Sequence, residues 1–283
     1  MDTVRSVLAG GSVPRELVVV DQSESANAEV AAIEEAHGCS VRYVRSASAG
    51  LSRARNIGIR TASEPVVVLL DDDMFVDENW LSTLVAGLPD GPRSVATGRV
   101  LPAAPEGQAG VVPPAALVTR DTPAVYRGAQ PADVVPGANV ALPRALVLAL
   151  GGYDERLGAG ARFGGADDND MGHRLLRAGC EVRHVPDAVV FHRAWRLRKE
   201  LFVLRWCYGR GKGAFYAKHI ASGDRHMRRR LGADAGRRLR AAGSAVFRSP
   251  RTTAAQLLTL GAIASGALEW LIVERFDRRE GDA

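Results

Sequence analysis

The sequence predicts an α/β protein with a mainly parallel central sheet. Short apolar runs alternate with stretches of helical spacing, which is the order of strand–helix–strand crossovers. The clearest run is residues 65–73, Pro-Val-Val-Val-Leu-Leu-Asp-Asp-Asp. A β-branched run of this length is typical of a strand buried on both faces in a parallel sheet. Its three carboxylates would then lie beyond the carboxyl end of the strand, where open α/β sheets bind their ligands.

The other elements follow from apolar spacing and from the residues that end each segment. We expect helices at residues 2–8, 26–36, 51–62, 78–86 and 167–178, and strands at residues 17–20, 41–44, 94–101, 182–185 and 188–191. Residues 101–136 are rich in Pro, Ala and Gly and have no periodicity, which predicts a long functional loop. The glycine-dense residues 157–165 predict a flexible flap.

Composition indicates an ordinary soluble globular protein, with 46% apolar and 24% charged residues. The first residues contain no long apolar region, so we expect no secretory signal. Cys39, Cys180 and Cys207 are odd in number and widely spaced, which indicates neither a disulfide framework nor a zinc site. These observations favour a cytoplasmic protein.

Charge divides the chain into two parts. Residues 1–192 hold 17 basic and 24 acidic residues, a net of −7, whereas residues 193–283 hold 20 basic and 8 acidic residues, a net of +12. The basic part suits an anionic partner, and we favour peripheral attachment to the anionic inner face of a membrane. A helix packed on the rest of the protein is the alternative for residues 193–220. Nucleic acid is an unlikely partner because no recognised binding motif accompanies the charge.

Residues 257–273 form a longer apolar stretch. It is rich in Ala, Gly and Thr and contains Glu269, and its 17 residues are at the lower limit for spanning a bilayer. Whether it touches the membrane is left open at this point. Two glycine-rich segments match no nucleotide-binding motif: residues 158–164 have the wrong spacing for a dinucleotide fingerprint, and residues 209–213 lack the Ser or Thr of a phosphate loop.

Two acidic clusters are the candidate sites. Repulsion among Asp71, Asp72 and Asp73 is best relieved by a hard divalent cation, although an acidic solvated turn has the same composition. The second cluster, residues 167–170, begins a predicted helix, where capping explains one carboxylate but not three. A surplus carboxylate beside a glycine-rich loop is a candidate general base, and base and cap both remain open. His192 ends an apolar strand and suits the shell of a shared cation.

Taken in order, these residues resemble the family 2 glycosyltransferases of the GT-A fold over about residues 17–192. The motifs that carry the resemblance are Val-Val-Val-Asp21 with Gln-Ser, Ala-Arg-Asn56-Ile-Gly, Leu-Leu-Asp71-Asp-Asp73, Gly137-Ala-Asn, Gly-Gly-Tyr-Asp-Glu155, Gly-Ala-Asp167-Asp-Asn-Asp-Met with Arg174, and Val-Val-Phe-His192. The family's first strand and loop have no counterpart here, because the chain begins almost at the family's first helix. We therefore expect that strand to be missing.

The resemblance implies a GT-A type Rossmann-like sandwich and a metal-dependent, inverting glycosyltransferase of the hexosyltransferase type. Its donor would be a nucleoside diphosphate sugar, its acceptor a hydroxyl of a glycan, lipid-linked or small molecule, and its cofactor Mn or Mg. By position in the motifs, the implied sites are Asp168 as base; Asp21, Arg55, Asn56, Asp71 and Asp72 for the nucleotide sugar; Asn139, Asp167 and Arg174 on the acceptor side; and Asp73, in the family's DXD motif, with His192 for the metal.

The same resemblance divides the chain into a catalytic domain, residues 1–192, and a basic helical extension, residues 193–283. Within the catalytic domain, the nucleotide-binding half would cover about residues 1–100 and the acceptor-binding half about residues 101–192. The alternative function is a non-catalytic module that binds a sugar nucleotide or a polyanion through an incomplete donor pocket.

Overall fold

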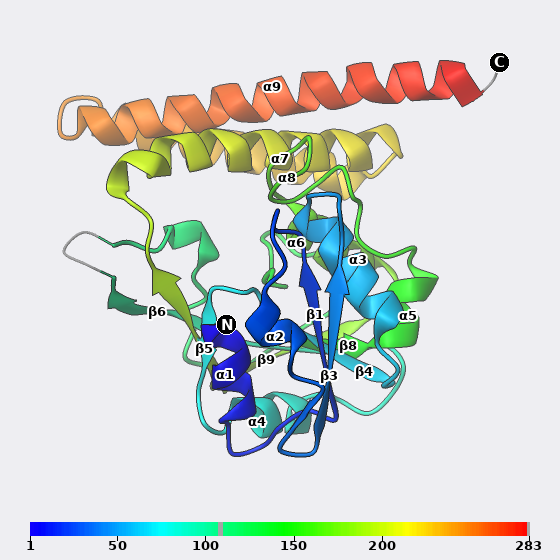
Figure 1. Ribbon diagram of the computed structural model, residues 1–283. Helices are drawn as coiled ribbons and strands as arrows, with labels where there is room; N and C mark the ends of the chain where they lie inside the picture. Colours follow the sequence, from blue (N-terminus) through cyan, green and yellow to red (C-terminus); the bar gives the residue numbers. More distant parts are fainter. Residues whose placement is uncertain (107–109, 282–283) are drawn as a thin grey trace.

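The computed structural model describes residues 1–106 and 110–281, with side chains up to residue 276. It consists of an α/β body below a layer of long helices, and the strands β1 and β3 point toward that layer (Figure 1). The predicted α/β class with a helical C-terminal extension is confirmed.

The first sheet is small and contains one of the predicted parallel crossovers. β1 (Glu16–Asp21) pairs in parallel with β3 (Cys39–Arg45), and β2 (Glu35–Ala36) pairs antiparallel with β3. The helix predicted for residues 26–36 is wrong beyond its first turns, since α2 is only Ala28–Ala31. His37 and Gly38 take positive φ angles of 55° and 77° and turn the chain back into the β2–β3 hairpin, which ends the helix early.

The second sheet is mixed and has the order β4-β8-β6-β9-β5, with β7 also on β9. Its strands are β4 (Val66–Leu69), β5 (Met74–Val76), β6 (Ser94–Pro105), β7 (Ala124–Tyr126), β8 (Val140–Pro143) and β9 (Glu181–Ala194). The long β6–β9 pair is parallel and the other pairs are antiparallel. β4, the strand predicted to be buried on both faces, is at one end of this order, and of its four residues only Val67 is buried. The two predicted strands at residues 182–191 are one continuous strand, β9.

Helices cover both faces of the second sheet. On one face, α3 (Leu51–Thr61), α5 (Arg144–Ala149) and α6 (Asp167–Arg177) contribute buried apolar residues to one core cluster. On the other, α1 (Asp2–Leu8) and α4 (Trp80–Ala86) contribute to a second cluster. The segment predicted as a long loop, residues 101–136, contains the end of β6, the short helix η1 (Pro114–Ala116) and β7, while residues 107–109 lie outside the described part.

The helical layer comprises the short η2 (Arg198–Glu200) followed by α7 (Leu201–Ala221), α8 (Arg225–Ala245) and α9 (Pro250–Gly281). The glycines of residues 209–213 lie in α7, and a methyl group on Gly209 or Gly213 would overlap atoms of α9. These glycines therefore serve close helix packing. By length and composition, the 27 residues Pro250–Phe276 of α9 also suffice to cross a membrane.

Residues 157–165, predicted as a flexible flap, are packed below this layer. Phe163 is fully buried and its ring lies 5.4 Å from that of Trp270 on α9. Arg162 forms an ion pair with Glu269, with Nε and Oε1 3.0 Å apart. The prediction of a free flap is wrong because the extension, whose contacts the local glycine pattern does not reveal, covers the segment.

Candidate active site

Asp71, Asp72 and Asp73 follow β4 and contact three different partners. Asp71 accepts a 2.8 Å hydrogen bond from Nη2 of Arg55, and the backbone oxygen of Asp72 accepts one of 2.5 Å from the Thr3 hydroxyl. Asp73 accepts a hydrogen bond of 3.2 Å from the indole nitrogen of Trp195. Burial raises the pKa of Asp72, and Asp73 and Asp71 raise it further because like charges disfavour ionisation. Asp72 is nevertheless exposed and lies in a turn with Asp73, whereas Asp71 and Asp73 are partly buried, so the triplet combines a turn with a concentration of negative charge.

Arg55 joins the two acidic clusters. It lies on α3, is almost fully buried, and forms ion pairs with Asp71 and with Asp167, the first residue of α6. Its guanidinium also lies 5.3 Å from the ring centre of Tyr153. A buried guanidinium needs such partners, since an unpaired charge is costly in the interior. The structure therefore brings the Asp71 side and the Asp167 side into one site.

The carboxylates at the start of α6 divide into three environments. Asp167 pairs with Arg55, while Asp170 is fully buried and is contacted at 2.8 Å by each of Arg174, Lys218 and His219. Against the effect of burial, the hydrogen bond from His219 and the charges of Lys218 and Arg174 hold the pKa of Asp170 well below its usual value. Asp168 has no cationic partner among the ion pairs of the described residues, which sets it apart from its neighbours.

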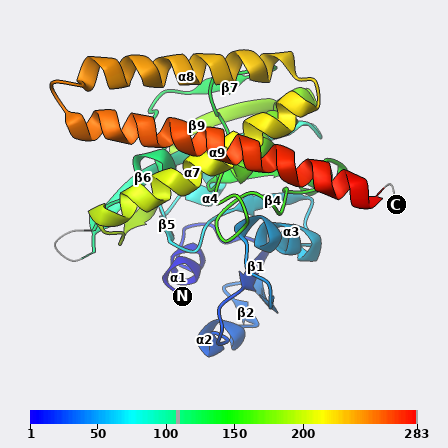
Figure 2. The ribbon, with the colours of Figure 1, turned by 90° about the horizontal axis from the view of Figure 1, so that it is seen from above.

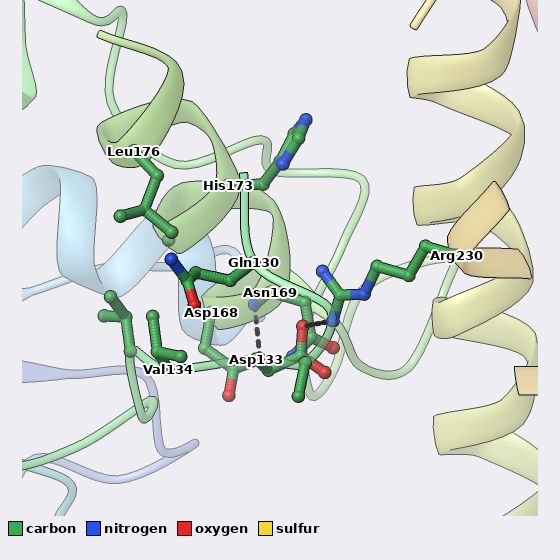
Figure 3. Close-up of a pocket in the computed structure, with 11 residues that line it drawn as sticks. Gln130, Asp133, Val134, Asp168, Asn169, His173, Leu176 and Arg230 are labelled. Atoms are coloured by element: carbon green, nitrogen blue, oxygen red, sulfur yellow. Dashed lines mark hydrogen bonds and ion pairs between the residues drawn. The ribbon is translucent and has the colours of Figure 1, made fainter. Parts of the chain in front are cut away.

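Asp168 lines a small pocket between α6, residues 130–135 and α8 (Figure 3). Asp133 faces it there and is paired with Arg230 from α8. Burial raises the pKa of Asp168 to about 7, with further contributions from Asp167 and Asp133. Gly137 allows a close approach, because a carbon added to it would lie 3.2 Å from Nη2 of Arg55 and 3.6 Å from Cβ of Asp168. A carboxylate with this pKa exchanges protons readily near neutral pH.

The backbone before α6 is under local strain. Ala166 has a φ angle of 69°, a left-handed conformation that costs a residue with a Cβ atom on the order of 1 kcal/mol. Ala166 is buried in a cluster with Phe215 and Tyr216 of α7 and Met227 of α8. The extension therefore helps to hold the turn that sets the direction of Asp168.

Asp73 and His192 adjoin one another at the end of β9. Nε2 of His192 is 3.7 Å from Oδ2 of Asp73, and its Nδ1 lies 3.0 Å from the backbone oxygen of Arg193. A proton on Nδ1 satisfies that contact, so the lone pair on Nε2 faces the carboxylate. One imidazole nitrogen and one carboxylate oxygen in this arrangement fit a shared divalent cation.

Three predicted site residues form hydrogen bonds to other parts of the protein. The amide of Asn56 bonds the backbone nitrogen and oxygen of Tyr153 at 2.7 and 2.9 Å. Asn139 is fully buried and bonds Trp80 and the backbone of β6 and β9. Arg174 bonds the backbone oxygens of Leu150 and Gly152. These side chains position the segments around the site, and direct contact with a ligand stays a prediction for them.

Asp21 is at the end of β1, as predicted, and is enclosed by its own neighbours. Ser23, Tyr43 and Arg45 all donate to its carboxylate. Although burial opposes it, these hydrogen bonds hold the pKa of Asp21 below its usual range. The adjacent Gln22 bonds the backbone of Gly50, which precedes α3, so the end of β1 is tied to the helix that carries Arg55.

Four further residues near the site were not predicted. Asp133 and Arg230 come from the aperiodic segment and from the extension, where no local pattern marks them. Tyr208 on α7 is the third. Burial raises its pKa, and the negative charges of the neighbouring carboxylates raise it further, whereas the charge of Arg196 lowers it; the carboxylates are Asp168, Asp73 and Asp71. Trp195 is the fourth. Its place three residues after His192 is the one feature in the sequence that could have indicated it.

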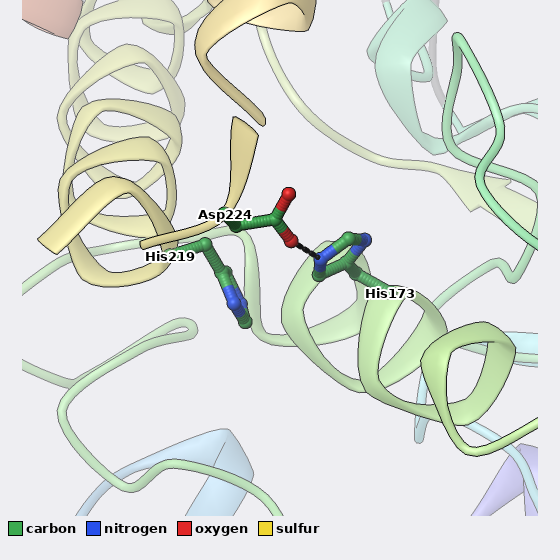
Figure 4. Close-up of side chains that lie close together, drawn as sticks. All are labelled: His173, His219 and Asp224. Atoms are coloured by element: carbon green, nitrogen blue, oxygen red, sulfur yellow. Dashed lines mark hydrogen bonds and ion pairs between the residues drawn. The ribbon is translucent and has the colours of Figure 1, made fainter. Parts of the chain in front are cut away.

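A histidine pair joins α6 to the extension. His173 bonds Asp224, which precedes α8, at 2.8 Å (Figure 4), and His219 on α7 bonds Asp170. His173, His219 and Asp224 have the composition of a metal site. However, Arg177 already pairs with Asp224, and Arg174 and Lys218 contact Asp170 in addition to His219. We therefore interpret the group as a hydrogen-bonded bridge between α6 and the helical layer above it.

Comparison with known proteins agrees with this fold. Residues 2–113 match the model of glycosyl transferase family 2. The chain is similar in structure to GalNAc-T7 solved with UDP, GalNAc and Mn2+, with a TM-score of 0.54 and 22% identity over 77% of this chain and 47% of that one. It is also similar to S. aureus TarS 1-349 in complex with UDP, with a TM-score of 0.50 and 13% identity over 99% of this chain and 87% of that one.

Curated relatives are glycosyltransferases by name. A pre-mycofactocin glycosyltransferase of Mycobacterium tuberculosis is 26% identical over 66% of this chain and 40% of its own length. A glucosyl-dolichyl phosphate glucuronosyltransferase of Haloferax volcanii is 27% identical over 77% of this chain and 71% of its own length. The chain thus spans less than half the length of the first of these relatives.

The fold is similar to the GT-A fold of these solved glycosyltransferase structures. The match to glycosyl transferase family 2 covers residues 2–113, and the relatives named above share 26–27% identity with this chain, so the chain is similar to the family 2 glycosyltransferases.

Proposed function

We propose that this protein transfers a sugar from a nucleoside diphosphate sugar to an acceptor hydroxyl with inversion at the anomeric carbon. The observation that carries the proposal is the position of Arg55, which forms ion pairs with both Asp71 and Asp167. In this proposal Asp71 belongs to the donor side and Asp167 to the acceptor side of a single site. UDP in the solved structures of GalNAc-T7 and TarS supports a nucleotide-sugar donor.

Asp168 is the general base in this proposal. Its raised pKa suits it to take the proton of the acceptor hydroxyl, whose oxygen attacks the anomeric carbon from the face opposite the leaving diphosphate. A single base suffices because inversion needs no covalent sugar intermediate. Asp167 and Arg174 act on the acceptor side through position, and Asn139 supports the loop that contains Gly137.

The donor side comprises Asp21, Arg55, Asn56, Asp71 and Asp72. Arg55 supplies a fixed positive charge and Asp71 an oxygen acceptor for a ribose or sugar hydroxyl, while the hydrogen-bonded Asp21 and Asn56 hold the surrounding turns. Asp73 and His192 would hold a Mn or Mg ion. Such an ion supplies charge neutralisation for a diphosphate leaving group.

The division of labour along the chain is also proposed. Residues 1–192 form the catalytic domain, with a nucleotide half to about residue 100 and an acceptor half from about residue 101, and residues 193–283 form the basic extension. We propose a cytoplasmic protein held at the anionic inner face of a membrane, because the extension carries a net charge of +12.

A donor-hydrolysis screen tests the proposal. The full chain is incubated with several nucleoside diphosphate sugars, with and without Mn, and release of the nucleoside diphosphate is followed. Metal-dependent release from one donor is expected, as is its loss in Asp73→Asn. Binding of a nucleoside diphosphate without turnover of any donor or transfer to any acceptor would favour the non-catalytic module instead.

A further inference from the structure

One end of the helical layer exposes a group of apolar side chains. α7 begins at the end of the layer where α8 ends and α9 begins (Figures 1 and 2). We call this group the apolar end; it consists of Trp195, Leu197, Phe202, Val203, Trp206 and Phe247. Phe247, in the turn between α8 and α9, is 95% exposed, and Val203 is 67% exposed. Large side chains grouped in this way mark an interaction surface.

Basic residues surround the apolar end. Arg198 and Lys199 precede α7, and Arg248 and Arg251 flank the start of α9; all four lie at the surface. None of them forms an ion pair with another of the described residues, in contrast to the many paired arginines of the body. Exposed aromatic side chains flanked by free cations match the interface of an anionic bilayer, where rings enter the headgroup region and cations meet lipid phosphates.

α9 is held on the rest of the protein by contacts that a bilayer-spanning helix would lose. Glu269 is paired with Arg162 of the body and Arg210 of α7, and Trp270 is buried below a cation–π contact with Arg156. A helix that crossed the bilayer would break these contacts and leave charges without partners. α9 therefore stays on α7, although its composition would allow it to span.

The apolar end adjoins the candidate metal ligands. Trp195 belongs to it, with an indole that is 45% exposed and whose nitrogen bonds Asp73. Its ring also stacks with Arg196, 4.3 Å from the ring centre. One residue thus links the exposed surface to the donor side of the site.

We infer that the apolar end docks into an anionic lipid bilayer while α9 stays packed on α7, and that Trp195 sets the Asp73 side of the site at the bilayer surface. This inference rests on the membrane attachment in the proposed function and specifies the surface that docks. The partner is the bilayer, because the charge of the extension is complementary to acidic headgroups.

Vesicle flotation tests the docking surface. The full chain is mixed with vesicles of phosphatidylcholine alone or with about one third phosphatidylglycerol, a fraction large enough to give a clear negative surface potential. Two double variants remove the apolar and the charged contacts: Val203→Ser with Phe247→Ser, and Arg248→Glu with Arg251→Glu. Leu148→Ser on α5 and Arg15→Glu before β1 are matched controls on the catalytic body, where the side chains are also exposed.

We expect the wild-type protein to float with the acidic vesicles. Both double variants should lose at least tenfold in vesicle affinity, and neither control should. Equal flotation with neutral vesicles, no flotation at all, or a change in oligomeric state in place of lost vesicle binding would overturn the inference. Donor hydrolysis measured without vesicles separates the two proposals, since it is expected to be unchanged in all four variants. If the protein binds vesicles but hydrolyses no donor, the inferred docking surface stands and the proposed enzymatic function is contradicted.

Discussion

Arg55 and Asp167 form a buried ion pair although 112 residues separate them in the sequence. The same guanidinium bonds Asp71, so the loop after β4 and the start of α6 are held at one distance by one side chain. This link connects the two acidic clusters and supports the proposed division into a donor side and an acceptor side.

Replacing Arg55 by methionine should lower the free energy of unfolding by about 3–5 kcal/mol, because it leaves Asp167 buried without its partner. Urea denaturation measures the change. Arg53→Met is the matched control on the same helix; its pair with Glu155 is partly exposed to solvent and should contribute less than about 1 kcal/mol. Equal losses in the two variants would contradict the role assigned to Arg55.

Asp168→Asn should reduce transfer by about 10²–10⁴-fold while binding of the nucleoside diphosphate persists, because only the proton acceptor is removed. In the wild-type protein, activity should rise with pH and level off above about 7, since the base must be ionised. A pH profile of kcat/KM, with nucleotide binding measured by calorimetry, checks both. A flat profile between pH 5.5 and 8.5 would count against Asp168 as base.

The raised pKa of Asp168 also predicts a stability effect. The folded protein binds this proton up to about pH 7, whereas the unfolded chain loses it near pH 4, so stability falls as pH rises through this window. An asparagine side chain does not ionise, so Asp168→Asn should be more stable than the wild type at pH 8, by about 1–2 kcal/mol, and nearly equal to it at pH 4. Thermal denaturation of both proteins at the two pH values measures this difference. If the variant and the wild type differ in stability by the same amount at pH 4 and at pH 8, the raised pKa of Asp168 is refuted.

Asp73→Asn and His192→Ala should weaken Mn binding. Loss of a residue that only supports a metal ligand typically costs about 10- to 100-fold in affinity, so loss of a ligand should cost at least about tenfold. Electron paramagnetic resonance of free Mn during a titration gives the affinity. Asp77→Asn, an exposed carboxylate just after β5, is the control and should bind Mn as the wild type does.

Phe163→Ala should destabilise the protein by about 3–5 kcal/mol, because the ring is fully buried against Trp270. Phe202→Ala, which removes an aromatic ring that is half exposed on α7, should cost less than about 1 kcal/mol. Hydrogen exchange of residues 157–165 gives a second measurement, with slow exchange in the wild type and faster exchange in Phe163→Ala. Rapid exchange of these residues in the wild type would support the prediction of a flexible flap.

Local pattern was enough for several parts of this protein. The apolar runs predicted β1, β3 and most of β6 and β9, because burial of one or both faces imposes its period on adjacent residues. Acidic triplets at a strand end and at a helix start identified both sides of the candidate site, since electrostatic repulsion within a short segment is visible in the sequence itself. The short α2 was missed because the hairpin after it, not its own spacing, ended the helix.

The sequence by itself determined which residues carry the candidate chemistry and that the chain ends in basic helices. Only the tertiary structure decided that Arg55 joins the two acidic clusters, that Asp133 and Arg230 lie beside Asp168, and that residues 157–165 are covered by α7 and α9. The reason is physical: strand and helix periods reflect neighbours within a few residues, whereas the Arg55–Asp167, Asp133–Arg230 and Arg162–Glu269 contacts join residues 97 to 112 positions apart. Burial and pKa follow from such contacts and have no local signature.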